Sequence, residues 1–238
     1  MALPCYLAMT AGEISANSIL PPDIAWMSCH FSCYHTGLTN IPKQLPPGAM
    51  LILNDQIPCH GHDPKRITDE VAAITEDFSC SRVLLDFERA GDSQAAAIAR
   101  HLVEALTVPV AVSDLYAQES AGPVFLPPCP LHQPLAEYLH PWEGREVWLE
   151  TAFCQEDILV TKNGSHFQNI YPPDRLSDGH WDESLNCRYR IDVQPDLITF
   201  TLFDTTETLR HKLAQAKELG VTTAIGLYQQ LGSVLSSI

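Results

Sequence analysis

The chain has 238 residues, of which 45% are hydrophobic and 18% charged, as in an ordinary globular protein of one large or two small domains. Its 29 acidic and 14 basic residues give a net charge of −15. This charge argues against nucleic acid or an anionic membrane as a partner, because both bind cationic surfaces. The most apolar stretch, residues 95–112, is interrupted by charged side chains, so we expect no transmembrane helix.

The sequence also bears on the location of the protein and on the redox state of its cysteines. The first residues lack a basic segment followed by a continuous apolar run, so the sequence as written favours a cytoplasmic protein. A secreted protein whose leader has been removed is the alternative. The eight cysteines are scattered and include no Cys-x-x-Cys pair, and we expect reduced thiols.

Eight short β-like runs alternate with helical or turn-like connectors along the chain. The predicted strands are residues 4–10, 24–28, 49–54, 82–87, 109–113, 123–126, 146–149 and 222–227. Such alternation favours a parallel sheet, and closing that sheet gives a (β/α)8 TIM barrel, which typically needs about 250 residues.

Three connectors carry the apolar periodicity of helices, at residues 64–78, 93–106 and 204–219. The first begins at Asp63-Pro64, an N-cap followed by proline, and the last ends at Gly220. The remaining connectors are short and rich in proline. We therefore expect a barrel in which several helices are shortened or missing.

Residues 151–203 do not follow the alternation. The turn Asn163-Gly164 lies inside a predicted hairpin at residues 158–167, and two further strands are predicted at residues 188–193 and 197–203. We predict one barrel domain over residues 1–238. Residues 151–196 form a small antiparallel β-rich insertion between its seventh and eighth strands.

The fourth predicted strand ends in two carboxylates. Alternation along the strand separates one face with Val83, Leu85 and Phe87 from another with Leu84, Asp86 and Glu88. The first face suits packing against helices. Paired acids at the carboxyl end of a parallel strand are typical of an active site in an α/β protein. The alternative is a strand that ends in a polar loop, with Glu88 paired to Arg82 or Arg89.

This layout resembles that of the family 18 glycoside hydrolases, the chitinase-like group. The resemblance rests on the fourth strand ending in Asp86-Phe87-Glu88, on a β-rich insertion after the seventh strand, and on the closing segment 203–228. It implies a (β/α)8 barrel that acts on a polysaccharide or glycan.

The family signature on the fourth strand is Asp-x-x-Asp-x-Asp-x-Glu. Glu88 matches its last residue, which the resemblance implies is the general acid, and Asp86 matches the aspartate that positions the substrate. Ser81 and Leu84 replace the two earlier aspartates. The tyrosine of the sixth strand and the tryptophan of the eighth have no counterpart in this chain.

We therefore predict a glycoside hydrolase-like protein with Glu88 as proton donor and Asp86 as its helper, a carbohydrate ligand and no cofactor. Substrate-assisted hydrolysis needs no protein nucleophile, whereas a two-carboxylate mechanism needs a partner acid from another strand. The candidates for substrate binding lie near the ends of other predicted strands. They are Asp55, Asp114 and Glu150, together with the aromatic residues Trp148 and Tyr228.

Two other functions are compatible with the sequence. The replaced signature residues favour a carbohydrate-binding protein on the same barrel that has lost catalysis. A metal-dependent hydrolase built from Asp55, His60 and His62 is a weaker alternative, because these residue types are common metal ligands. In the simpler interpretation of that turn, Asp63 caps a helix and the histidines lie at the surface.

Overall fold

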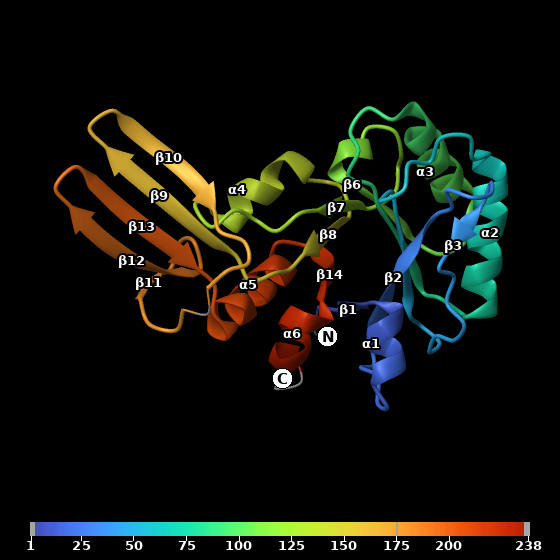
Figure 1. Cartoon of the computed structure of the whole chain (residues 1–238), viewed down its shortest axis with the longest axis horizontal. Helices are drawn as coiled ribbons and strands as arrows, with labels where there is room; N and C mark the ends of the chain where they lie inside the picture. Colours follow the sequence, from blue (N-terminus) through green and yellow to red (C-terminus); the bar gives the residue numbers. More distant parts are fainter. Residues whose placement is uncertain (1–2, 175, 236–238) are drawn as a thin grey trace.

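The computed structural model describes residues 3–174 and 176–235, and it contains a closed parallel barrel with an antiparallel sheet beside it (Figure 1). Each barrel strand pairs in parallel with the next, and β1 pairs with both β2 and β14, which closes the ring. The predicted (β/α)8 barrel is thereby confirmed. Its strands are β1 (Cys5–Met9), β2 (Ile24–Phe31), β4 (Met50–Asn54), β5 (Arg82–Asp86), β6 (Val110–Ser113), β7 (Val124–Leu126), β8 (Val147–Glu150) and β14 (Val221–Leu227).

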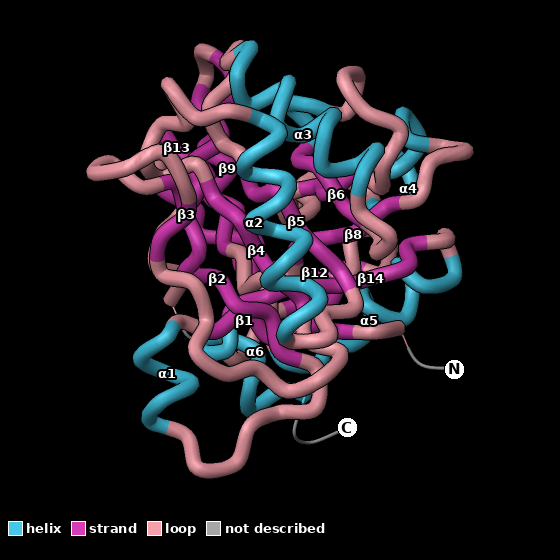
Figure 2. Tube along the Cα trace, turned by 90° about the vertical axis from the view of Figure 1, so that its right-hand side faces the viewer, coloured by secondary structure: helices cyan, strands magenta, loops and turns pink. Residues whose placement is uncertain are grey.

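The helices outside the barrel are unequal in length, as predicted. Two of the three long ones, α2 (Pro64–Asp77) and α3 (Ser93–Ala105), lie side by side and share one apolar cluster with β4, β5 and β6 (Figure 2). Asp63 caps α2 by accepting the N–H of Arg66. The other helical elements are α1 (Ala11–Ala16), the 3-10 turn η1 (Asp114–Tyr116), α4 (Leu135–Leu139), the 3-10 turn η2 (His140–Trp142), α5 (Thr206–Glu218) and α6 (Tyr228–Leu235).

A two-residue strand, β3 (Leu38–Thr39), pairs antiparallel with the end of β2. The predicted second strand ends at Ser28, but β2 continues to Phe31 across a register shift between Trp26 and Cys29. This extension carries His30 toward the mouth of the barrel.

The alternation of side chains on β5 separates two apolar layers, as predicted. Val83, Leu85 and Phe87 are buried in the layer between the barrel and α2 and α3. Leu84 points into the barrel, where it packs with a second cluster that includes Ile52, Ala111, Phe125, Trp148 and Ile225. Because Asp86 and Glu88 follow Leu84 on the same face, both carboxylates reach the open end of the barrel.

The antiparallel sheet has the strand order β10-β9-β13-β12-β11 and lies between β8 and α5, so the predicted β-rich insertion is present. Its strands are β9 (Gln155–Thr161), β10 (Gly164–Asn169), β11 (His180–Asp182), β12 (Cys187–Gln194) and β13 (Leu197–Phe203). The sheet extends to Phe203, because β13 pairs with both β9 and β12. Figure 1 shows it projecting to one side of the barrel.

The structure also bears on membrane-spanning helices and on the state of the cysteines. Within residues 3–174 and 176–235, no helix is both long enough and apolar enough to cross a bilayer. All eight cysteines are free thiols, four of them partly or fully exposed and four buried.

Candidate functional site

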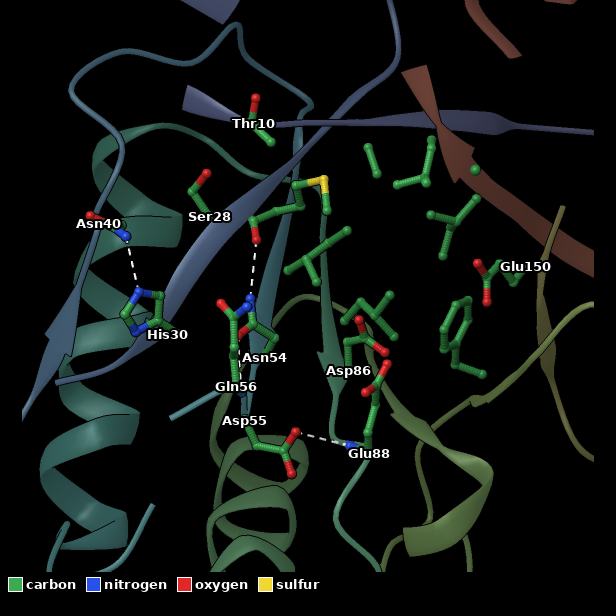
Figure 3. A pocket seen from close by; sticks show the side chains of 18 residues that line it. Thr10, Ser28, His30, Asn40, Asn54, Asp55, Gln56, Asp86, Glu88 and Glu150 are labelled. Carbon is green, nitrogen blue, oxygen red and sulfur yellow. Dashed lines mark hydrogen bonds between the residues drawn. The ribbon is translucent and has the colours of Figure 1, made fainter. Parts of the chain in front are cut away.

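A pocket of about 490 Å³ opens at the carboxyl ends of the barrel strands. This volume lies within the range of about 300–1,000 Å³ that is typical of small-molecule sites. The ends of β1, β2, β4, β5, β7, β8 and β14 all contribute to it. Its labelled polar side chains in Figure 3 are Thr10, Ser28, His30, Asn40, Asn54, Asp55, Gln56, Asp86, Glu88 and Glu150.

Three carboxylates dominate one end of the pocket. Asp86, the last residue of β5, and Glu88 just after it lie next to each other, and Glu150 comes from the end of β8 (Figure 3). Asp86 and Glu150 are half-buried, whereas Glu88 is exposed to solvent. The structure therefore brings the two acids of β5 together with one acid from a different barrel strand.

Burial and mutual repulsion both disfavour the charged forms of these acids. Burial, followed by the charges of Glu88 and Asp55, raises the pKa of Asp86 to about 6. Burial, followed by the charges of Asp86 and Glu88, raises the pKa of Glu150 to about 7. Two carboxyl groups of this pocket thus retain protons at pH values where an exposed carboxyl would be ionised.

No side chain neutralises this group of acids. The described part of the chain gives the carboxylates of Asp86, Glu88 and Glu150 no hydrogen bond and no ion pair. No lysine or arginine is among the described residues that line the pocket. The acids are therefore available to a ligand.

Asp55 also lines the pocket, but its carboxylate is already occupied. It is 4% exposed and accepts the backbone N–H groups of Glu88 and Arg89, at 3.0 Å each. The Arg89 guanidinium donates in turn to the backbone carbonyls of Asp55 and Gln56. Asp55 thus fixes the backbone that carries Glu88, and it is a positioning residue.

Three residues predicted to bind substrate do not line the pocket. Trp148 is fully buried inside the barrel, where its Nε1 donates to Glu146 at the opposite end. Asp114 begins η1 and accepts the N–H of its neighbour Leu115. Tyr228 begins α6, and its hydroxyl lies 3.2 Å from Oδ1 of Asn17. A position near the end of a strand did not bring these side chains into the mouth.

The residues of the alternative metal site point in different directions. His60 is exposed and lies 4.0 Å from Asp92, while His62 is buried beside Phe31. Asp55 is engaged by the two backbone N–H groups described above. Among the described residues, no group of three or more histidine, cysteine, aspartate or glutamate side chains has an arrangement that could hold a metal ion.

The polar wall opposite the carboxylates was not foreseen. His30 lies 3.0 Å from the Asn40 amide, and Asn54 donates to the backbone carbonyl of Met27. Asn54 ends β4, and Ser28 is the last residue of the predicted second strand, so the rule that selected Asp86 and Glu150 also applied to them. Asn40 follows β3, a strand too short to leave a signal in the sequence.

No protein-family model and no curated protein matches the sequence. Among solved structures, a family 18 N-acetylglucosaminidase from Paenibacillus barengoltzii has a TM-score of 0.61 at 11% identity, covering 99% of both chains. A mutant family 18 chitinase from Cycas revoluta in complex with (GlcNAc)4 has a TM-score of 0.62 at 11% identity, covering 99% of this chain and 98% of that one.

The spore cortex-lytic enzyme SleL of Bacillus cereus is also similar, with a TM-score of 0.57 at 11% identity over 94% of this chain and 70% of that one. The resemblance inferred from the layout of strands is therefore confirmed for the fold. The chain has a (β/α)8 barrel similar to those of family 18 glycoside hydrolases, at a remote distance in sequence.

Proposed function

We propose that the protein is a glycoside hydrolase that binds a glycan in the pocket and cleaves it by acid catalysis, with Glu88 as the proton donor. The observation that carries the proposal is the group of three unpaired carboxyl groups at the mouth of the barrel. The carboxyl ends of the strands are also where TIM-barrel enzymes place their active sites.

Acid catalysis requires a carboxyl group that still holds a proton near the operating pH. Asp86 and Glu150 retain protons because burial raises the pKa values of these two groups to about 6 and about 7. Glu88 is the exposed member of the group, so its carboxyl group is the most accessible to a glycan that enters the pocket. Asp86 lies beside it and supports it as a proton source (Figure 3).

Two routes complete the reaction after the leaving group is protonated. A substrate with a 2-acetamido group can supply its own nucleophile, and a substrate without one needs a carboxylate from the protein. Glu150 is the acid from another strand that meets this second need, since Asp114 lies outside the pocket and Asp55 is bound to backbone N–H groups.

The test is hydrolysis of a panel of glycans, measured as released reducing ends, by the wild type and by Glu88→Gln. We expect Glu88→Gln to lose at least a hundredfold in kcat/KM, since general acid catalysis typically contributes about 10²–10⁴-fold. Asp114→Asn, which also removes one carboxylate near a strand end but outside the pocket, is the control and should retain activity. Equal turnover by Glu88→Gln and wild type would refute the assignment.

A carbohydrate-binding protein without catalysis is the second candidate. It is favoured by the ends of β7 and β14, the sixth and eighth strands of the barrel. Their described residues in the pocket lining include Phe125 and Leu227 but no tyrosine or tryptophan. Binding of a glycan at the pocket, lost in Glu150→Gln, together with no turnover of any bound glycan would establish this function in place of hydrolysis.

A further inference from the structure

The charge of the pocket is its most unusual property. Four carboxylates line it, namely Asp55, Asp86, Glu88 and Glu150, and the backbone N–H groups of Glu88 and Arg89 satisfy only Asp55. His30, at the far wall, is the one titratable base among the described lining residues, and it is engaged with Asn40 and with the carbonyl of Phe31. The pocket thus has acids in excess and no cation beside them.

Acids that are partly removed from water without a counter-charge are unfavourable, and a protein usually pairs them or leaves them protonated. The nearest arginine does not relieve this group, because Arg89 donates to the carbonyls of Asp55 and Gln56. A bound cation would attract both Asp86 and Glu150, so it would favour their ionised forms and offset their mutual repulsion. An anionic sugar would meet the same acids and be repelled.

We infer that the pocket is adapted to a glycan with free amino groups, and that Glu150 and Asp86 hold its ammonium. This inference rests on the proposed function and names its substrate class. The amine lies on the sugar ring, so the ring hydroxyls face the polar wall of Ser28, Asn40 and Asn54 while the ammonium faces the acids. The net charge of −15 favours the approach of such a polycation from solution.

Glu150 is the specificity-determining residue in this arrangement. It comes from β8, apart from the Asp86 and Glu88 pair of β5, so it is positioned to contact the ligand from a second side. Its replacement by glutamine keeps the shape and removes the charge. The acetylated form of the same glycan lacks the ammonium and gains nothing from the charge of Glu150.

The experiment measures binding by calorimetry in a Glu88→Gln background, so that no ligand is hydrolysed. The probes are the tetramer of glucosamine and the tetramer of N-acetylglucosamine. We expect the glucosamine tetramer to bind at least tenfold tighter than the acetylated tetramer, and we expect its affinity to fall with added salt. Adding Glu150→Gln should remove at least tenfold of this affinity and leave the acetylated tetramer unaffected.

Two controls separate the site from general charge effects. Glu143→Gln removes one negative charge from a side chain that is 82% exposed and outside the pocket, and it should change neither affinity. Spermine carries amines without sugar rings, and binding as tight as that of the glucosamine tetramer would refute recognition of a glycan.

The failure of this inference differs from the failure of the proposed function. Equal or tighter binding of the acetylated tetramer, or no effect of Glu150→Gln, would overturn the preference for amino sugars. Hydrolysis of the acetylated tetramer that depends on Glu88 would then still stand as glycoside hydrolysis. Turnover independent of Glu88 would refute the proposed function in its assignment of Glu88 as proton donor and leave the binding result unchanged.

Discussion

Glu150 lowers the stability of the folded protein at neutral pH. Its pKa is raised to about 7 in the fold, against about 4.3 in an unfolded chain. Below about pH 4 both states are protonated and the group makes no difference. As pH rises from about 4 to 7 the unfolded state loses its proton first, so the free energy of unfolding falls and the loss persists above pH 7.

Glu150→Gln should therefore stabilise the protein at pH 8 by about 1–2 kcal/mol, or about 3–6 °C in Tm for a chain of this size, after an allowance for solvent screening. At pH 3.5 the same substitution should change Tm little. Thermal unfolding at both pH values measures the difference, with Glu143→Gln as the exposed control. A Tm gain of equal size at both pH values would contradict a charge effect.

The site shows how far single residues can be placed from the sequence. The rule that acids at the ends of parallel strands gather at one mouth led to Asp86, Glu88 and Glu150, which line the pocket. The rule does not predict how far below the mouth of the barrel a side chain lies. Trp148 fills the barrel interior although it lies on the same strand face as Glu150. Nor did it foresee that Asp114 starts a 3-10 turn.

At the scale of elements, the loop after β4 holds the loop after β5. Asp55 accepts the N–H groups of Glu88 and Arg89, so one carboxylate joins two adjacent strand ends. The alternation within each strand was predictable, because period-two patterns follow from backbone geometry. The bridge between the loops was not, because it depends on which strands become neighbours.

Asp55→Ala should destabilise the protein by about 2–4 kcal/mol, since it leaves two backbone N–H groups without their acceptor. It should also lower the proposed activity by displacing Glu88. The losses of stability and activity in Asp55→Asn should be smaller than those in Asp55→Ala, because the amide oxygen still accepts one N–H while the NH₂ group opposes the other. Denaturant unfolding measures stability, and kcat/KM on a cleaved glycan measures the second effect. A fully active Asp55→Ala protein would contradict the positioning role.

Short elements account for most of what the sequence did not reveal. The eight barrel strands and three long helices carry strong periodic patterns, and all appear close to the predicted residues. The helices α1, α4 and α6 have only 6, 5 and 8 residues, too few turns for a clear apolar stripe. β2 continues past its register shift to Phe31 because it pairs there with β3 and β4, and this pairing leaves no local signal in the sequence.

At the scale of the whole molecule, one buried carboxylate joins the barrel to the antiparallel sheet. Asp204 follows β13, its side chain is 1% exposed, and it accepts from Lys212 at 2.8 Å, from the Thr208 hydroxyl at 2.7 Å and from the N–H of Cys154 at 3.2 Å. These partners belong to α5 and to the segment between β8 and β9. The position of the sheet therefore depends on a charge pair.

Lys212→Ala tests this junction, because it leaves the Asp204 charge buried and unpaired. Removing one partner of a buried pair costs about 3–5 kcal/mol. We expect a loss of that size in denaturant unfolding, with faster hydrogen exchange in β9, β12 and β13 than in β4 to β6.

Arg190→Ala breaks the Arg190–Asp178 pair on the same sheet, where Asp178 is 87% exposed, and should cost less than about 1 kcal/mol. Equal losses in the two variants, or exchange that rises uniformly across the barrel, would show that Asp204 does not anchor the sheet. The contrast between the two ion pairs thus distinguishes a structural junction from surface charge.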